Sequence, residues 1–369
     1  MNKISTGQPP FPQLRYCTRC CLPETTEGIA FDELGICQAC RSQEQKMRID
    51  WSVREKKLRQ ILDEAKARAG DNYDCMVPIS GGKDSAFQLH ILCKVYGMNP
   101  LAVTFSHNWW SETGKKNLAR VLEVFDVDHV MYTPKRGLVN RLARQSLPLI
   151  GDSCWHCHAG VYSFPFHIAV KFGIPLMVYG ESFAEASART TYVDEDQEEK
   201  EMVSYAWKNS AKVSTDAMVG DLVSRKELRM FYPPTPDELK AAGIRGIHLG
   251  DFLFWDHERQ TEFLIKEYGW MEDEREAAYK HYKSVECRMA GVHDYAKYVK
   301  RGFGRGTDEA AQDVRSGLLT REEAFDLAAK VDAERPSTLD YYKEITGYTE
   351  EEFHEILKSK REDKAKLLP

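Results

Sequence analysis

The stretch Tyr73–Gly97, YDCMVPISGGKDSAFQLHILCKVYG, places a glycine pair, a lysine and an aspartate between an apolar run and a helix-like segment. The apolar run Cys75–Ile79 has the length of a buried strand. The residues from Asp84 onward have helical spacing, and Gly97 is a stop signal. We therefore predict a strand, a tight glycine turn and a helix in direct succession.

The glycine turn has the composition of an anion-binding loop. Gly81 and Gly82 let the backbone turn and approach a ligand closely, and the helix that follows offers free amides and the positive end of its dipole. Lys83 adds a positive charge. The turn is not a Walker A loop, because Asp84 and Val77 stand where that pattern has its Ser or Thr and its first glycine. A structural turn without a ligand is the disfavoured alternative.

Apolar stretches alternate with helical ones further along the chain. Strand-like runs at Leu101–Phe105, His129–Tyr132 and Leu176–Tyr179 are separated by helical segments. Such alternation is typical of parallel strands joined by crossover helices. We predict an α/β fold with a doubly wound parallel sheet, in which ligands bind beyond the carboxyl ends of the strands.

Four of the ten cysteines form two CxxC pairs that are separated by sixteen residues. Two such turns can aim four thiolates at one point, and zinc accepts this tetrahedron with Zn–S distances of about 2.3 Å. A closed shell of four thiolates leaves no open position, so we predict a structural zinc ribbon. Its ligands would be Cys17, Cys20, Cys37 and Cys40.

Helix signals outside the core suggest how the chain is divided. Ser52 and Glu55 have the spacing of a capping box, with Gly70 as the expected helix end. Thr320 and Glu323 form another capping box in a mainly helical C-terminal region. We predict a zinc-ribbon-like module over 1–49, an α/β domain over 50–215 and a mainly helical substrate or partner region over 216–369.

The composition disfavours several classes of protein. The chain has 369 residues, is 42% hydrophobic and carries a formal net charge of -6. We find no apolar run long enough to cross a bilayer and no signal peptide in Met1–Leu14, so we expect a soluble cytoplasmic protein without a membrane partner. Nucleic acid is disfavoured because no basic block is present. The acidic run Asp194–Glu201 is expected to be a solvated loop, or else a lid or docking surface.

The six residues Ser80–Ser85, SGGKDS, resemble the signature of the PP-loop ATP pyrophosphatases, which have an adenine nucleotide alpha hydrolase-like fold and cleave ATP between its α and β phosphates. The resemblance implies that this loop cradles pyrophosphate, that Lys83 and Asp84 are catalytic, and that Mg²⁺ lies near Asp84. The ATP-binding residues that it implies are Ser80, Gly81, Gly82, Lys83, Asp84, Ser85, Phe105, Ser106 and Gly180.

Three further stretches resemble the N-acetyl sugar amidotransferases of surface polysaccharide and nonulosonate biosynthesis. They are the cysteine ribbon, IPLMVYGES at 174–182, and the C-terminal region that contains HLGDFLFWD and KRGFGRGTDE. The resemblance implies ATP-dependent conversion of an acetamido group of a nucleotide-activated sugar to an acetamidino group. It also implies that ammonia comes from a separate glutaminase with a barrel partner, both related to proteins of histidine biosynthesis.

Charged residues near these motifs are candidates for the site. Glu181 and Glu185 follow the last strand-like run and could bind Mg²⁺ or orient ammonia, although ordinary loop carboxylates are an equal alternative. Arg301, Arg305 and Asp308 lie in a glycine-rich segment that we do not expect to form a regular helix. The arginines could hold substrate phosphates through bidentate contacts, or could be solvated. We predict a catalytic role for Glu181 and substrate binding by Arg301, Arg305 and Asp308.

A second cysteine group leaves another function open. Cys154 and Cys157 form a further CxxC pair, and Cys287 stands alone. Three thiolates can hold an iron–sulfur cluster with one open iron, or zinc together with a histidine, whereas free or buried thiols are an equal alternative. The pattern resembles that of PP-loop tRNA thiolation enzymes, so sulfur transfer to tRNA or a small molecule is the second function considered. A nucleotide sensor is disfavoured, because it needs neither the ribbon nor the arginine-rich segment.

Overall fold

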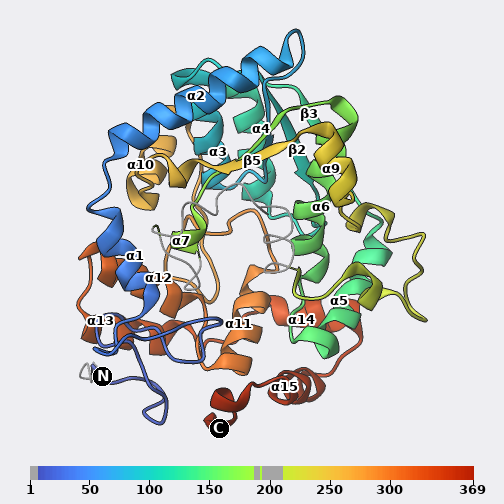
Figure 1. Ribbon diagram of the computed structural model, residues 1–369. Helices are drawn as coiled ribbons and strands as arrows, with labels where there is room; N and C mark the ends of the chain where they lie inside the picture. Colours follow the sequence, from blue (N-terminus) through green and yellow to red (C-terminus); the bar gives the residue numbers. More distant parts are fainter. Residues whose placement is uncertain (1–6, 187–191, 193–210) are drawn as a thin grey trace.

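The computed structural model describes residues 7–186, 192 and 211–369. Its centre is a five-stranded sheet of order β3-β2-β1-β4-β5 in which each neighbouring pair is parallel, so the predicted α/β fold with a parallel sheet is confirmed (Figure 1). The acidic run Asp194–Glu201 lies outside the described residues. The strands are β1 Cys75–Pro78, β2 Pro100–Phe105, β3 His129–Tyr132, β4 Leu176–Tyr179 and β5 Arg245–His248.

Strand β1 occupies the position from which the sheet is wound in both directions. It pairs with β2 from Cys75↔Pro100 onward and with β4 at Met76↔Met177. The chain therefore moves outward through β2 and β3 before it returns to the other side of β1. This order creates a topological switch point between β1 and β4, where the loops that follow the two strands face each other.

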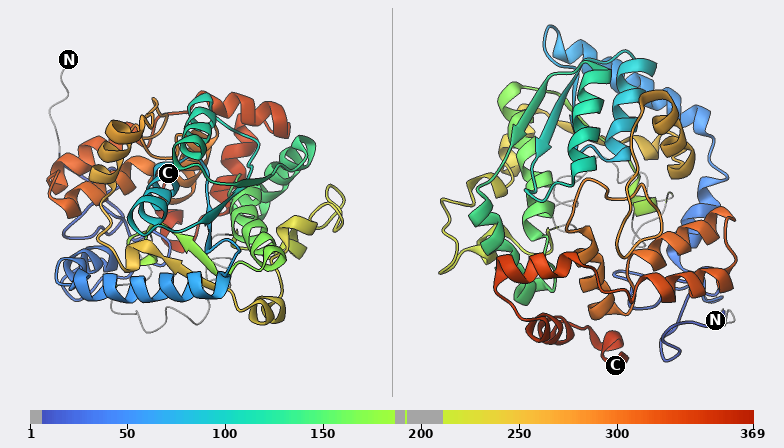
Figure 2. Two further views of the ribbon diagram at one scale, coloured as in Figure 1. Left: turned by 90° about the horizontal axis from the view of Figure 1, so that it is seen from above. Right: turned by 180° about the vertical axis from the view of Figure 1, so that it is seen from behind.

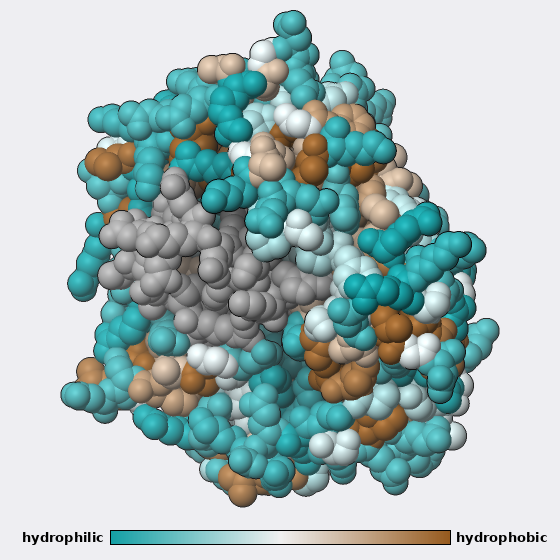
Figure 3. Space-filling view, turned by 45° about the vertical axis from the view of Figure 1, so that its right-hand side comes forward, coloured by the Kyte–Doolittle hydropathy of each residue, from teal (hydrophilic) through white to brown (hydrophobic). Residues whose placement is uncertain are grey.

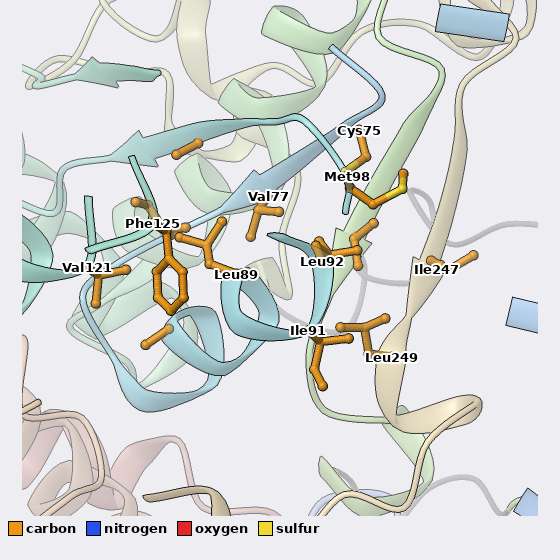
Figure 4. Close-up of a cluster of buried hydrophobic side chains, with 14 of the residues drawn as sticks. Cys75, Val77, Leu89, Ile91, Leu92, Met98, Val121, Phe125, Ile247 and Leu249 are labelled. Atoms are coloured by element: carbon orange, nitrogen blue, oxygen red, sulfur yellow. The ribbon is translucent and has the colours of Figure 1, made fainter. Parts of the chain in front are cut away.

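Successive residues of the strands pack on opposite faces of the sheet. In β1, Cys75 and Val77 belong to one buried cluster, whereas Met76 belongs to another. The first cluster includes side chains of α2, α3, α4 and α10, some of which are shown in Figure 4, and the second includes side chains of α5 and α6. Helices thus cover both faces, as a doubly wound sheet requires.

Helices α11 to α15 form a second layer beyond the carboxyl edge of the sheet, next to the N-terminal ribbon (Figures 1 and 2). The helices are α1 Gln38–Lys46, α2 Trp51–Ala69, α3 Lys83–Leu89, α4 Glu112–Phe125, α5 Arg136–Ile150, α6 Trp155–Phe172, α7 Phe183–Ala186, α9 Pro236–Ala242, α10 His257–Tyr268, α11 Ala290–Arg301, α12 Arg305–Ser316, α13 Arg321–Val331, α14 Thr338–Thr346 and α15 Glu350–Ser359.

Two sequence-based expectations about these elements need correction, and a third holds in part. The N-cap of α2 is Asp50, whose carboxylate accepts from the amides of Ser52 and Val53, so the predicted capping box at Ser52 is wrong. Strand β5 was missed and extends the sheet past residue 215. The segment around Arg301 and Arg305 does not form one regular helix, as expected, but it is helical on both sides of a break, because α11 ends at Arg301 and α12 begins at Arg305.

Other helix ends follow the sequence signals. Gly70 is the C-cap of α2, and the Thr320–Glu323 capping box begins α13 as predicted. The face seen in Figure 3 is mostly hydrophilic, with hydrophobic side chains in small groups. Among the described residues, no helix combines the length and the apolar character that a membrane span requires.

Gly160 allows α6 to pack closely on β2. A Cβ atom at this position would lie 2.2 Å from the ring of Phe105, so Gly160→Ala must displace the ring or the helix. Overpacking of this kind lowers the free energy of unfolding by about 1–3 kcal/mol. We expect a loss of that size in urea denaturation, although alanine is the better helix former.

Gly137→Ala is the matched control for this prediction. Gly137 lies near the start of α5, and a Cβ atom there would have a guanidinium nitrogen of Arg141 as its nearest neighbour, at 3.7 Å. There the helix propensity of alanine should leave the free energy of unfolding unchanged or raise it by up to about 1 kcal/mol. Equal effects of the two substitutions would contradict the close contact between α6 and β2.

Candidate functional site

The loop after β1 requires a glycine at position 81. Gly81 has φ 75°, and a Cβ atom there would lie 2.8 Å from the carbonyl oxygen of Gly114. Gly82 is the N-cap of α3 and makes no side-chain cap hydrogen bond. The helical segment continues beyond α3 into a π-helical turn, His90–Val95. The first-turn amides of α3 therefore begin at this loop, where an anion would be favoured by both the amides and the helix dipole.

A chain of polar contacts links this loop to the loop after β4. Lys83 Nζ lies 2.7 Å from Asp84 Oδ1 and 2.7 Å from His257 Nδ1. His257 Nε2 lies 2.9 Å from Glu181 Oε1 on the opposite loop. The lysine can donate to both of its neighbours, and the imidazole can donate its Nε2 proton to Glu181. Three predicted site residues are thus joined through His257, the first residue of α10.

A cavity of about 180 Å³ opens above the loop. It combines residues of the β1 and β4 loops with residues of the C-terminal half of the chain. Its lining consists of Ser80, Gly82, Lys83, Asp84, Ser85, Glu181, His257, Tyr282, Lys283, Ser284, Glu286 and Arg305. Predictions from three separate parts of the sequence, namely Ser80–Ser85, Glu181 and Arg305, therefore meet at one cavity.

The two carboxylates on the floor of the cavity favour the ionised form. Burial acts to raise the pKa of Asp84, but the nearby Lys83 and His257 outweigh it and hold the pKa below its usual value. Burial likewise opposes ionisation of Glu181, and His257 more than compensates, so that its pKa is also lowered. Ionised carboxylates are ligands that hard divalent cations prefer. Asp84 and Glu181 are accordingly the residues that could hold Mg²⁺ here.

The opposite wall of the cavity carries one acidic side chain, Glu286, and two basic ones, Lys283 and Arg305. Burial raises the pKa of Glu286 and lowers that of Lys283. Arg305 Nε lies 3.2 Å from the buried Asp294 carboxylate, and this neighbour raises the pKa of the arginine. Arg305 therefore remains charged on the side of the cavity that faces the glycine loop.

Arg301 and Asp308 do not share this location. Arg301 faces the N-terminal ribbon, where Nη1 donates to the carbonyl oxygen of Thr25 at 2.9 Å and Nη2 lies 3.1 Å from Glu27. It lines a separate cavity of about 210 Å³. Asp308 pairs with Lys297. Of the three predicted substrate-binding residues, only Arg305 lines the 180 Å³ cavity above the glycine loop.

Three residues predicted to bind ATP are buried at the ends of two strands, Phe105 and Ser106 at the end of β2 and Gly180 after β4. Phe105 packs against Phe231, with ring centroids 5.4 Å apart. Ser106 Oγ accepts a hydrogen bond of 2.8 Å from Trp110 Nε1. Gly180 accepts a hydrogen bond of 2.8 Å from the amide of Gly250. None of these three described residues lines the 180 Å³ cavity, so their role in ATP binding stays a prediction.

The two predicted carboxylates after β4 have different surroundings. Glu181 lines the 180 Å³ cavity, whereas Glu185 forms an ion pair of 2.8 Å with Lys46 of α1. Glu185 also lines a neighbouring cavity of about 500 Å³. His257 and Tyr282 line both this cavity and the one of about 180 Å³. The two cavities therefore meet at these two side chains.

The four ribbon cysteines converge as predicted. Their sulfur atoms lie within 4.8 Å of one another, with 3.9 Å between Cys17 and Cys40 and 3.7 Å between Cys20 and Cys37. Tetrahedral zinc with bonds of about 2.3 Å places its sulfur ligands about 3.8 Å apart. The cluster is buried against Ala310 and Phe325 of α12 and α13. The cysteines could therefore hold a metal such as zinc.

The second cysteine group is arranged differently from the prediction. Cys154, Cys157 and Cys287 border the same buried cluster. Within the described residues, however, the ligand atoms that converge there belong to Asp152, Cys154 and His293. Burial raises the pKa of Cys287 to about 12.

Several residues of the site were not anticipated from the sequence. His257 and residues 282–284 and 286 reach the cavity only through long-range packing. The one available signal was local: Asp256 is an N-cap, and its side chain accepts from the amide of Arg259, which places His257 at the start of a helix. Nothing in that signal indicates that the helix start faces the glycine loop.

Fold and site together define an α/β protein with a charged cavity at the switch point of a parallel sheet. Residues 260–366 match the family model described as LPS biosynthesis protein WbpG-like, C-terminal domain. The matched region contains Tyr282–Glu286 and Arg305 but not the glycine loop. The match supports a role in the biosynthesis of lipopolysaccharide or another surface glycan.

A curated relative shows a shorter likeness. An uncharacterized protein of Methanocaldococcus jannaschii is 28% identical over 105 residues, which is 28% of this chain. The chain covers 37% of the length of that relative.

Glu309 is a buried carboxylate close to the cavity. Its Oε2 accepts from the amides of Tyr279 and Lys280, at 3.0 and 3.1 Å. Burial raises its pKa from 4.5 to about 7, although Arg305 and Lys283 act in the opposite direction. The folded protein therefore keeps the proton on Glu309 over a pH range in which the unfolded chain releases it.

This difference predicts a pH-dependent effect of Glu309→Gln. Between pH 4.5 and 7 only the unfolded wild-type chain ionises at this position. As the pH rises through this range, the free energy of unfolding of the wild type should therefore fall by up to about 3 kcal/mol relative to that of the variant. Glutamine keeps an oxygen that can accept both amides. Urea denaturation of both proteins at several pH values measures the difference. A stability difference that stays constant with pH would contradict the raised pKa.

Proposed function

We propose that the protein is an ATP-dependent amidotransferase of the PP-loop type. It converts the N-acetyl group of a nucleotide-activated sugar to an acetamidino group in surface-glycan biosynthesis. One observation carries the proposal: the SGGKDS loop shares one cavity with Glu181 and with residues 282–284, 286 and 305 of the region that matches the LPS biosynthesis family.

The loop supplies the groups needed to stabilise a departing pyrophosphate. The amides at the start of α3 and the ammonium group of Lys83 meet at one place. Negative charge that develops on the leaving group would be stabilised by these fixed donors, which need no reorganisation during the reaction. Lys83 is already held by Asp84 and His257, so its position is set before a nucleotide enters.

Asp84 and Glu181 would hold Mg²⁺, which neutralises phosphate charge when bound. Arg305 and Lys283 lie on the other wall of the cavity and can contact the α phosphate or the diphosphate of the sugar nucleotide. His257 lies between Lys83 and Glu181 and positions both. Each wall of the cavity therefore has a distinct role in binding two phosphate-bearing substrates.

The reaction balances in two steps. The acetamido oxygen attacks the α phosphorus of ATP, and an O-adenyl imidate forms as pyrophosphate leaves. Ammonia then adds to the imidate carbon, AMP departs with the oxygen, and a proton is released. An amide carbonyl does not accept ammonia unaided, so activation by ATP is required. We further propose that a separate glutaminase with its barrel partner delivers the ammonia, as the family resemblance implies.

A sulfurtransferase is the second candidate, and one observation favours it. Glu286 lines the cavity, and its neighbour Cys287 borders the buried group that contains Cys154 and Cys157. Sulfur chemistry would therefore have thiols within one residue of the cavity wall. The two reactions differ in the atom that replaces oxygen, so the product mass separates them.

The test is to incubate the protein with ATP, Mg²⁺, ammonium and a panel of UDP- and CMP-linked N-acetyl sugars. We expect AMP and a sugar product that is lighter by about one mass unit, because NH replaces oxygen. Lys83→Ala should reduce AMP release at least about 100-fold, since a preorganised donor is lost. Lys94→Ala is the matched control, because Lys94 belongs to the same helical segment but does not line the cavity.

Circular dichroism would establish that both variants remain folded. A product heavier by about sixteen mass units with a sulfur donor would favour the sulfurtransferase instead. AMP release by Lys83→Ala at the wild-type rate would contradict the role of the loop.

A further inference from the structure

We propose that the protein has a second metal site, with Asp152, Cys154 and His293 as its ligands. The three ligand atoms lie within 4.8 Å of one another. They come from distant parts of the sequence, since Asp152 and Cys154 lie between α5 and α6 and His293 lies in the first turn of α11. The site is separate from the ribbon and does not depend on the proposed reaction.

The distances between the three ligand atoms are close to those between the ligands of a bound zinc ion. Four-coordinate zinc with bonds of about 2.0–2.3 Å places its ligand atoms about 3.3–3.8 Å apart. His293 Nδ1 is already 3.3 Å from Asp152 Oδ1. Small side-chain adjustments, on the order of 1 Å, would bring all three atoms to one ion.

The carboxylate of Asp152 is oriented for this role. Its side chain is only 3% exposed. Oδ1 faces His293 and accepts the amide of Cys154 at 2.7 Å. Oδ2 lies 3.4 Å from Lys212 Nζ and 3.9 Å from His158 Nδ1. One oxygen thus points toward the other ligands while the second is held by a cation, as outer partners hold carboxylate ligands in metal sites.

An ordinary ion pair explains only part of this arrangement. A contact between Asp152 and His293 would not require a thiol, yet the sulfur of the buried Cys154 lies within 4.8 Å of both ligand atoms. Carboxylate, thiol and imidazole together form a mixed donor set. A metal ion accounts for all three donors at once.

The donor set indicates the class of metal. Oxygen-seeking cations such as Mg²⁺ and Ca²⁺ do not choose thiolates, whereas zinc accepts sulfur, nitrogen and oxygen. Three protein ligands leave one position for water or for His158, whose ring lies 5.5 Å from that of His293. The side chain of His293 is 27% exposed, so an ion can enter from solvent.

This ligand set differs from three convergent cysteines. Cys157 and Cys287 border the same cluster and remain partly exposed, but the converging set includes only Cys154 of the three. The two alternatives therefore make opposite predictions for Cys157 and His293.

The test is the metal content of the full chain after anaerobic incubation with zinc and removal of free ions. Elemental analysis should find two zinc ions per wild-type chain, one in the ribbon and one in the proposed site. His293→Ala and Cys154→Ala should each retain one. Cys157→Ala is the matched control, because it removes a neighbouring thiol in the first turn of α6, and it should retain two.

A Co²⁺-substituted sample gives a second readout. The spectrum of wild type minus His293→Ala should show absorption from one thiolate bound to cobalt. One zinc per wild-type chain would overturn the proposal. So would loss of metal from Cys157→Ala with full retention by His293→Ala, which would support the three-cysteine arrangement. His293 is partly exposed, so its variant keeps the test valid if Cys154→Ala fails to fold.

Discussion

The site depends on one constraint, the parallel pairing of β1 with β2 on one side and with β4 on the other. This pairing places the loop Ser80–Ser85 opposite Glu181. Parallel strands end at the same edge, so both loops project into the same space. The contact of His257 with Lys83 and with Glu181 then fixes the distance between the loops. A shift of one residue in the register of β1 would move Lys83 and Asp84 away from these partners.

The C-terminal region completes the site, and the N-terminal ribbon braces that region. Arg321 Nε donates to the carbonyl oxygens of Cys17 and Cys20, at 3.0 and 3.1 Å. Arg301 donates to the carbonyl oxygen of Thr25. The ribbon thus contacts α12 and α13 and the end of α11, and α12 begins with Arg305 at the cavity. A metal bound by the four cysteines would therefore stabilise the wall of the cavity from a distance.

The sequence predicts those features that depend on local patterns. Strands β1, β2 and β4 are short apolar runs because they are buried on both faces, whereas β3 is a partly buried edge strand. Strand β5, Arg245–His248, is half polar and leaves no such signal. The glycine loop could be recognised because its conformation requires a glycine at position 81. Helix ends are harder to predict when two caps compete. At α2 the Asp50 carboxylate accepts from the amide of Ser52, which Glu55 would have bonded in a capping box at Ser52.

Long-range packing accounts for what the sequence did not predict. Arg301 and Arg305 are four residues apart, yet Gly302 ends one helix and Gly304 caps the next, so the two arginines face different cavities. The convergence of Asp152 with His293 likewise depends on the contact between distant segments. Spacing along the chain carries no information about such contacts.

The central claim is that the loop after β1 directs cleavage of ATP at its α phosphorus. The most direct measurement is exchange of labelled pyrophosphate into ATP, with Mg²⁺ and an acceptor sugar present and ammonia absent. The account predicts that label enters ATP, because adenylyl transfer is reversible when the second step cannot proceed. Formation of ADP and orthophosphate without any exchange, across the full panel of sugars, would contradict it.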